Sequence, residues 1–170
     1  VSVLKGVHPR RVPRKDNGRV TLVSAAVRQH ANDSTQFMFG SEWPSYFEEQ
    51  CEFVEELSTD IQERLTIRLY PTDYGCDQEV RWRDRFENIA LDLGETVLDR
   101  KVARERLVVP TYNSTTYLES LSANIPTVMF WTSGYGDVRQ SAMVGIQLLE
   151  SVGIFHTTPV GAARHISAIW

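Results

Sequence analysis

The chain has 170 residues, of which 42% are hydrophobic and 24% are charged, so it is long enough and apolar enough to form one domain with its own core. Its formal net charge of -4 argues against a surface that tracks nucleic acid, because such a surface needs clustered Lys and Arg. Its 2 cysteines lie far apart without a His or Cys at ligand spacing, which argues against a disulfide framework and a zinc site. The sequence also lacks an apolar run of about 18 residues, the length that would indicate a membrane span.

The amino-terminal segment is basic and precedes any periodic pattern. Residues 1–18 include Arg10, Arg11, Arg14 and Lys15, and we interpret them as a linker or solvated basic arm. Residues 19–170 form the predicted domain. Because the chain starts with Val and ends inside a predicted helix, we expect a fragment of a longer two-domain chain. Without a leader sequence, we expect it to act in the cytoplasm or at the inner face of the membrane.

The first elements of the domain alternate between strand and helix patterns. Residues 20–27 are β-branched and apolar, which predicts a buried strand with Ser24 at or just beyond its carboxyl end. Over residues 44–64 apolar side chains recur every three or four positions while Glu takes the others, which predicts a surface helix with an acidic outer face. Residues 65–70 predict a second strand, which Pro71 closes.

The second half of the chain repeats this alternation. We expect strands over residues 89–93, 106–111 and 127–131, and helices over residues 79–86, 95–104, 114–124, 140–152 and 159–170. Strands that alternate with helices favour a parallel sheet covered on both faces. The sequence therefore predicts an α/β fold, a Rossmann-like three-layer sandwich with a mainly parallel sheet of about five or six strands.

Ligands of open parallel sheets bind beyond the carboxyl ends of the strands. None of the predicted loops there carries a Gly-rich dinucleotide fingerprint or a P-loop lysine, so NAD and P-loop chemistry are disfavoured. Residues 111–119, after the fourth strand, instead place five small or amide-bearing polar residues between a buried strand and an apolar helix: Thr111, Asn113, Ser114, Thr115 and Thr116. Their hydroxyls and backbone amides could hold a phosphate, and Glu119 could accept from ribose hydroxyls. Ordinary helix capping, with Thr116 and Glu119 as a capping box, stays open as the alternative.

The second strand contains a cation among apolar residues. An unpaired Arg68 would be costly there, so it should meet a carboxylate or a phosphate. Because side chains alternate along a strand, Arg68 and Tyr70 share a face and could both point toward a ligand. A structural ion pair between Arg68 and Asp92 is the alternative. Asp73, in the next loop, could bind a base or sugar or could stabilise the turn.

Two blocks of this sequence resemble GT-B glycosyltransferases. Residues 108–131 resemble their donor-site strand, loop and helix, above all in transferases of bacterial surface-carbohydrate biosynthesis, where a Ser/Thr pair opens the helix and a Glu follows about one turn later. Residues 68–75, followed by residues 81–84, form the second block. Tyr70-Pro71 stands where related bacterial sialyltransferases and polyol-phosphate polymerases have His-Pro, so the resemblance leaves the nucleotide base open.

The resemblance implies that this chain is one half of a GT-B fold, the donor-binding domain of a glycosyltransferase in bacterial surface polysaccharide biosynthesis. Its partners would be a nucleotide-activated sugar, a glycan or lipid-linked acceptor, and an amino-terminal domain that supplies the catalytic base, so the fragment alone is expected to be inactive. The donor-binding residues would be Ser114, Thr115, Thr116, Glu119, Asn113, Arg68, Tyr70 and Ser24.

No cofactor or metal is expected for such an enzyme. The sequence has no Asp-X-Asp pair, which agrees with metal-independent GT-B chemistry. Two other functions stay open at this point: a non-catalytic nucleotide-binding or regulatory module, and one half of a sugar-nucleotide epimerase.

Overall fold

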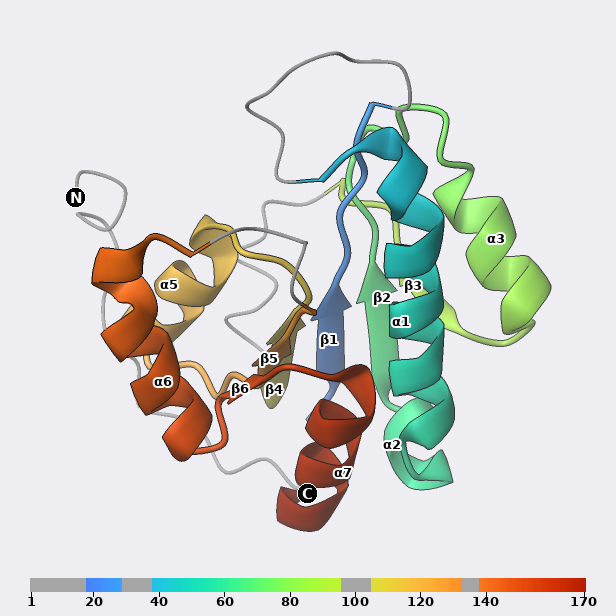
Figure 1. The fold of residues 1–170 in the computed structure, drawn as a ribbon. Coiled ribbons are helices and arrows are strands. Elements are labelled where there is room, and N and C mark those ends of the chain that lie inside the picture. Colours follow the sequence, from blue (N-terminus) through green and yellow to red (C-terminus); the bar gives the residue numbers. More distant parts are fainter. Residues whose placement is uncertain (1–17, 29–37, 96–104, 133–137) are drawn as a thin grey trace.

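The structure, a computed structural model, describes residues 18–28, 38–95, 105–132 and 138–170 (Figure 1). The basic arm, apart from its last residue, and nearly all of the helix expected over residues 95–104 lie outside the described residues. No helix in the described part of the chain is long and apolar enough to cross a membrane.

The sheet is parallel and has its centre at β1 (Val20–Val23) and β4 (Leu107–Pro110). On one side of β1 lie β2 (Leu65–Arg68) and β3 (Ala90–Asp92), which gives a four-stranded order of β3-β2-β1-β4. On the other side, β5 (Met129–Phe130) pairs with β6 (Phe155–His156), and a parallel bridge from Val108 to Thr127 joins this pair to β4. The combined order 3-2-1-4-5-6 is that of a Rossmann fold, which confirms the predicted fold class.

The helices follow from this order. The connections β1→β2→β3 and β4→β5→β6 run in opposite directions, and right-handed crossovers place their helices on opposite faces. The elements that connect the first three strands are α1 (Trp43–Glu56), preceded by the 3-10 turn η2 (Gly40–Glu42), then α2 (Thr59–Gln62) and, between β2 and β3, α3 (Gln78–Arg85). The second half contributes α5 (Thr115–Ser122), the turn η3 (Gln140–Ala142), α6 (Met143–Ser151) and α7 (Pro159–Ile169), which packs back on α1 (Figure 1).

The main core lies between the sheet and α1. Phe53 of α1 stacks on Phe130 of β5 with ring centroids 5.0 Å apart, and Phe47 meets Trp82 of α3 edge-on at 5.1 Å. A smaller core on the other face joins Val23 to Val108 and Ile125. Buried apolar side chains on both faces explain why the strands read as continuous apolar runs.

The helix expected over residues 44–64 is interrupted in the structure. Leu57, the C-cap of α1, has an extended backbone with ψ at 146°, and α2 begins two residues later. The side-chain amide of Gln62 donates to the carbonyl oxygens of Val54 (2.8 Å) and Leu57 (2.9 Å) where α1 ends, and Val54 also accepts from the Leu57 N–H at 3.3 Å. Apolar side chains keep recurring every three or four residues across this break, so the sequence pattern could not reveal that the helix is interrupted.

The turn before α3 depends on one carboxylate. Asp73 accepts hydrogen bonds from the backbone N–H groups of Gly75 (3.1 Å), Asp77 (2.8 Å) and Gln78 (2.8 Å). Partial burial acts to raise the pKa of Asp73, but these amides outweigh it and hold the pKa below its usual value. Of the two roles open for Asp73, the structure shows the turn-stabilising one.

We expect Asp73→Ala to reduce the free energy of unfolding by about 1 kcal/mol near neutral pH, because three amides lose their acceptor. A carboxyl whose pKa is lowered by folding stabilises the protein above its unfolded pKa of about 3.9 and loses that contribution as pH falls through the folded value. Urea unfolding at about pH 7 and about pH 3 should therefore show a difference between wild type and variant that shrinks in acid. An equal difference at both pH values would contradict this role.

Candidate functional site

The carboxyl ends of β1 and β4 meet where the strand order reverses. β1 and β4 are neighbours, but the connection after β1 leads to β2 on one side of the sheet and the connection after β4 leads to β5 on the other side. In doubly wound sheets, ligands bind at this switch point. Ser24 directly follows β1 and Thr111 directly follows β4, which places the loop of predicted donor-binding residues at the same position.

A tyrosine of α1 joins these two strand ends. The Tyr46 hydroxyl accepts from the Ala25 N–H at 3.0 Å and lies 2.5 Å from Thr111 Oγ1. Thr111 Oγ1 donates its single proton to the Val23 carbonyl oxygen at 2.8 Å, so Tyr46 is the donor of the 2.5 Å bond. Burial raises the pKa of the Tyr46 phenol well above its usual value, and the phenol keeps this proton.

Ser24 lies in this network with an unused hydroxyl. The residue is 2% exposed, and its Oγ lies beside the Tyr46 hydroxyl without a hydrogen bond of normal geometry to any partner. A buried hydroxyl left in this way costs about 1–3 kcal/mol. In native proteins, such groups commonly have a catalytic role or bind a water or an ion.

Ser114 begins α5. It is the N-cap, and its Oγ accepts from the Thr116 N–H at 3.3 Å. This bond satisfies one of the four amides that the first turn of a helix leaves without an intrahelical partner. Ordinary capping, which the sequence left open as an alternative, is therefore present at Ser114, whereas the capping box between Thr116 and Glu119 is not the cap of this helix. The positive end of the α5 dipole lies directly after β4.

Tyr112 brings several predicted residues together. Its phenol is within hydrogen-bonding reach of the Ser114 and Thr116 hydroxyls, and Tyr70 and Glu119 are close enough to act on it electrostatically. Burial raises the pKa of Tyr112, Tyr70 and Glu119 raise it further, and the two hydroxyls lower it. Residues from the loop after β2, from the N-cap of α5 and from α5 itself therefore act on one protonated phenol.

The other predicted residues have different surroundings. Arg68 is buried, and its Nη1 lies 2.7 Å from Asp92 Oδ2, so the ion-pair alternative for Arg68 is what the structure shows. Arg68 and Tyr70 therefore have different surroundings: the Arg68 side chain is buried in an ion pair, whereas Tyr70 lies beyond the end of the strand and is exposed. Asn113 is half-buried in the loop before α5, and Thr115 is exposed at the first position of that helix.

Three residues of this site were not among those predicted. Sequence reasoning gave Tyr112 a role in shaping its loop or contacting the sugar, counted Thr111 only among the polar residues of that loop, and gave Tyr46 no role. Within the described residues, no group of three or more His, Cys, Asp or Glu side chains could hold a metal ion. The connections of residues 29–37 and 133–137, which follow β1 and β5, lie outside the described residues.

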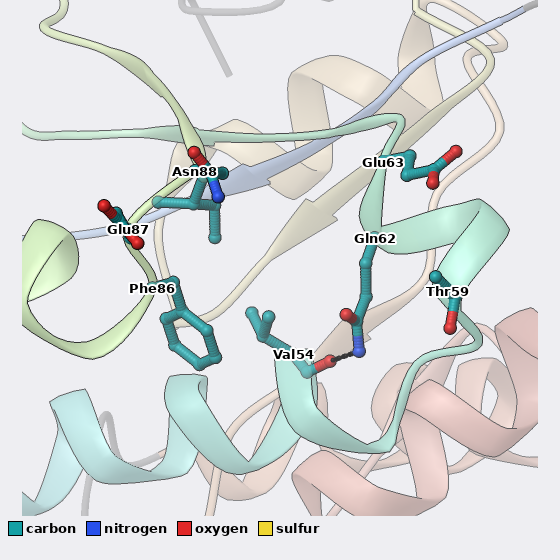
Figure 2. A pocket seen from close by; sticks show the side chains of 8 residues that line it. Val54, Thr59, Gln62, Glu63, Phe86, Glu87 and Asn88 are labelled. Atoms are coloured by element: carbon teal, nitrogen blue, oxygen red, sulfur yellow. Dashed lines mark hydrogen bonds between the residues drawn. The ribbon is translucent and has the colours of Figure 1, made fainter.

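A pocket of about 290 Å³ lies at the opposite edge of the sheet, next to the amino ends of β2 and β3. Its lining comes from the end of α1, from α2 and from the connection between α3 and β3: Val54, Thr59, Gln62, Glu63, Phe86, Glu87, Asn88 and Ile89. Figure 2 shows the Gln62 amide bonded to the Val54 carbonyl oxygen, with the Phe86 ring beside Val54. None of the predicted donor-binding residues lines this pocket.

Comparison with known proteins identifies the family. A model described as LIC12162 family transferase matches residues 3–170, which is nearly the whole chain. No curated protein and no solved structure shows a significant match. The match spans every strand and helix of the sheet and the loop that begins α5. The chain therefore belongs to the LIC12162 family of transferases.

Proposed function

We propose that this chain is the donor-binding domain of a glycosyltransferase and holds the phosphate of a nucleotide-activated sugar at the start of α5. The observation that carries the proposal is the cluster of hydroxyls around Tyr112 and Ser114 at the switch point of a transferase-family Rossmann fold. The GT-B resemblance of residues 108–131 supports a sugar nucleotide as the donor and surface polysaccharide as the product.

The site can stabilise an anionic leaving group. As the bond to the sugar breaks, negative charge develops on the departing phosphate. In this proposal the first-turn amides of α5, the helix dipole and the hydroxyls of Ser114 and Thr115 stabilise that charge without a metal. Tyr112 remains protonated and can donate, and Ser24 offers a further hydroxyl. Glu119, one turn along α5, can accept from ribose hydroxyls.

The remaining parts of the reaction would come from outside this site. By the GT-B resemblance, a second Rossmann-like domain would bind a glycan or lipid-linked acceptor and supply the catalytic base, in the cytoplasm or at the inner face of the membrane. Membership in a transferase family favours this proposal over an epimerase half. A regulatory module stays the competing function, and nucleotide binding separates the two.

Calorimetric titration of UMP, CMP, GDP and their sugar conjugates tests the proposal. We expect Ser114→Ala to weaken the best nucleotide about three- to tenfold, because one hydrogen bond to phosphate and part of the helix cap are lost. Glu119→Ala should weaken nucleotides but not inorganic pyrophosphate, because pyrophosphate has no ribose. Thr158→Ala is the matched control, since Thr158 is the N-cap of α7 and its Oγ1 accepts from the Gly161 N–H at 3.1 Å. Absence of binding by every nucleotide to folded wild-type protein would contradict the proposal and favour the regulatory module.

A further inference from the structure

Two tyrosines and an arginine form a partly exposed aromatic surface next to this site, in which Tyr70 is exposed and Tyr74 is half-buried against the core. Tyr70, two residues after β2, is 39% exposed, and its ring centroid lies 5.9 Å from that of Tyr74 with the rings inclined by 33°. The guanidinium of Arg28, from the segment after β1, lies 5.5 Å from the Tyr74 ring centroid. We call Tyr70, Tyr74 and Arg28 the tyrosine platform.

The backbone that presents the platform is held in place. Tyr74 has a φ of 56°, a left-handed conformation that bulky residues rarely adopt. The three amide hydrogen bonds to Asp73 hold this loop, and the Gln78 amide bonds to both the N–H and the carbonyl oxygen of Tyr70 at 3.3 Å. A surface fixed before a ligand arrives loses less conformational freedom on binding.

The platform adjoins the start of α5. Tyr70 acts electrostatically on Tyr112, and Tyr112 in turn reaches Ser114 and Thr116. β2 and β4 are both neighbours of β1, so their carboxyl ends lie on either side of Ser24. A nucleotide whose phosphate lies at the start of α5 can therefore reach the tyrosine platform with the group attached on one side of that phosphate.

We propose that the tyrosine platform binds the nucleobase of the donor by stacking, an inference that rests on the proposed function. An exposed ring presented by a rigid loop suits a planar aromatic ligand, and Arg28 adds a cation above the same aromatic surface. Stacking tolerates any base because every base has a π face. In this orientation the activated sugar lies on the other side of the phosphate, toward β5.

Titration of UMP, CMP and GDP in parallel with inorganic pyrophosphate tests this inference. We expect Tyr70→Ala and Tyr74→Gly each to weaken nucleotide binding by at least about fivefold and to leave pyrophosphate binding unchanged. Glycine suits the left-handed backbone at position 74, so Tyr74→Gly removes the ring without straining the loop. Tyr70→Phe keeps a stacking ring and should keep the nucleotide affinity.

The outcomes separate the two proposals. If wild-type protein binds neither nucleotides nor pyrophosphate, the proposed function is wrong and the inference falls with it. If wild type binds nucleotides and the Ala and Gly variants bind them equally well, only the stacking role is overturned. Equal losses for nucleotides and pyrophosphate would also overturn it, because the platform would then act on the phosphate.

Discussion

Replacement of Arg68 by Met is expected to lower the free energy of unfolding by about 3–5 kcal/mol. The Arg68 and Asp92 side chains are 6% and 12% exposed, with Nη1 and Oδ2 2.7 Å apart. Met fills similar space but leaves the Asp92 carboxylate buried beside a neutral side chain, where its charge is poorly solvated. Urea unfolding measures the loss.

Two further variants show whether the charge causes this loss. Arg83→Met removes an exposed pair with Glu79 and should change stability by less than about 0.5 kcal/mol. In the Arg68→Met/Asp92→Asn double variant both charges are absent, while the side-chain oxygen that accepts from Gly94 N–H remains, so at least about 1 kcal/mol should be recovered. If Arg68→Met abolished nucleotide binding and left stability unchanged, Arg68 would be a donor ligand and its structural role would be wrong.

Tyr46→Phe is expected to lower the free energy of unfolding by about 2–3 kcal/mol. The substitution removes only the hydroxyl, which accepts from Ala25 N–H and donates to Thr111 Oγ1, and it leaves that buried amide without its acceptor. Thermal or urea unfolding gives the difference.

Tyr117→Phe is the matched control for Tyr46→Phe. Burial alone raises the pKa of Tyr117, and its ring contact with Trp131, 5.8 Å between centroids, is kept by Phe. The control should stay within about 0.5 kcal/mol of wild type. Equal effects of the two substitutions would mean that the Tyr46 hydroxyl does not join β1 to β4.

The fold class was predictable because most elements carry a clear period. The apolar runs at residues 20–27, 65–70 and 106–111 contain β1, β2 and β4, although each strand is shorter than its run. β6 was missed because its two residues are too few to show a pattern. The break at Leu57 was missed because it depends on a side chain from the next turn, Gln62, that no helical period encodes.

The candidate site was predictable only where its residues are contiguous. Ser114, Thr116 and Glu119 fall within six positions and follow a strand pattern, so their grouping could be read directly. Tyr46 lies 65 positions from Thr111 and occupies an apolar position of an amphipathic helix, where it reads as an ordinary core residue. The alternation of side chains along the strand left two partners open for Arg68, a ligand phosphate or the Asp92 carboxylate. Only the register of β2 against β3, which aligns Arg68 with Asp92, decides between them.

Amide chemical-shift mapping by NMR tests the central claim most directly, because it locates the bound phosphate. With isotope-labelled protein titrated with pyrophosphate and then UMP, we predict the largest shifts at the amides of residues 114–117, which form the start of α5, and at Ser24 and Ala25. Shifts confined to residues 59–63 and 86–89, around the pocket at the opposite edge, or no shifts at all, would contradict the account.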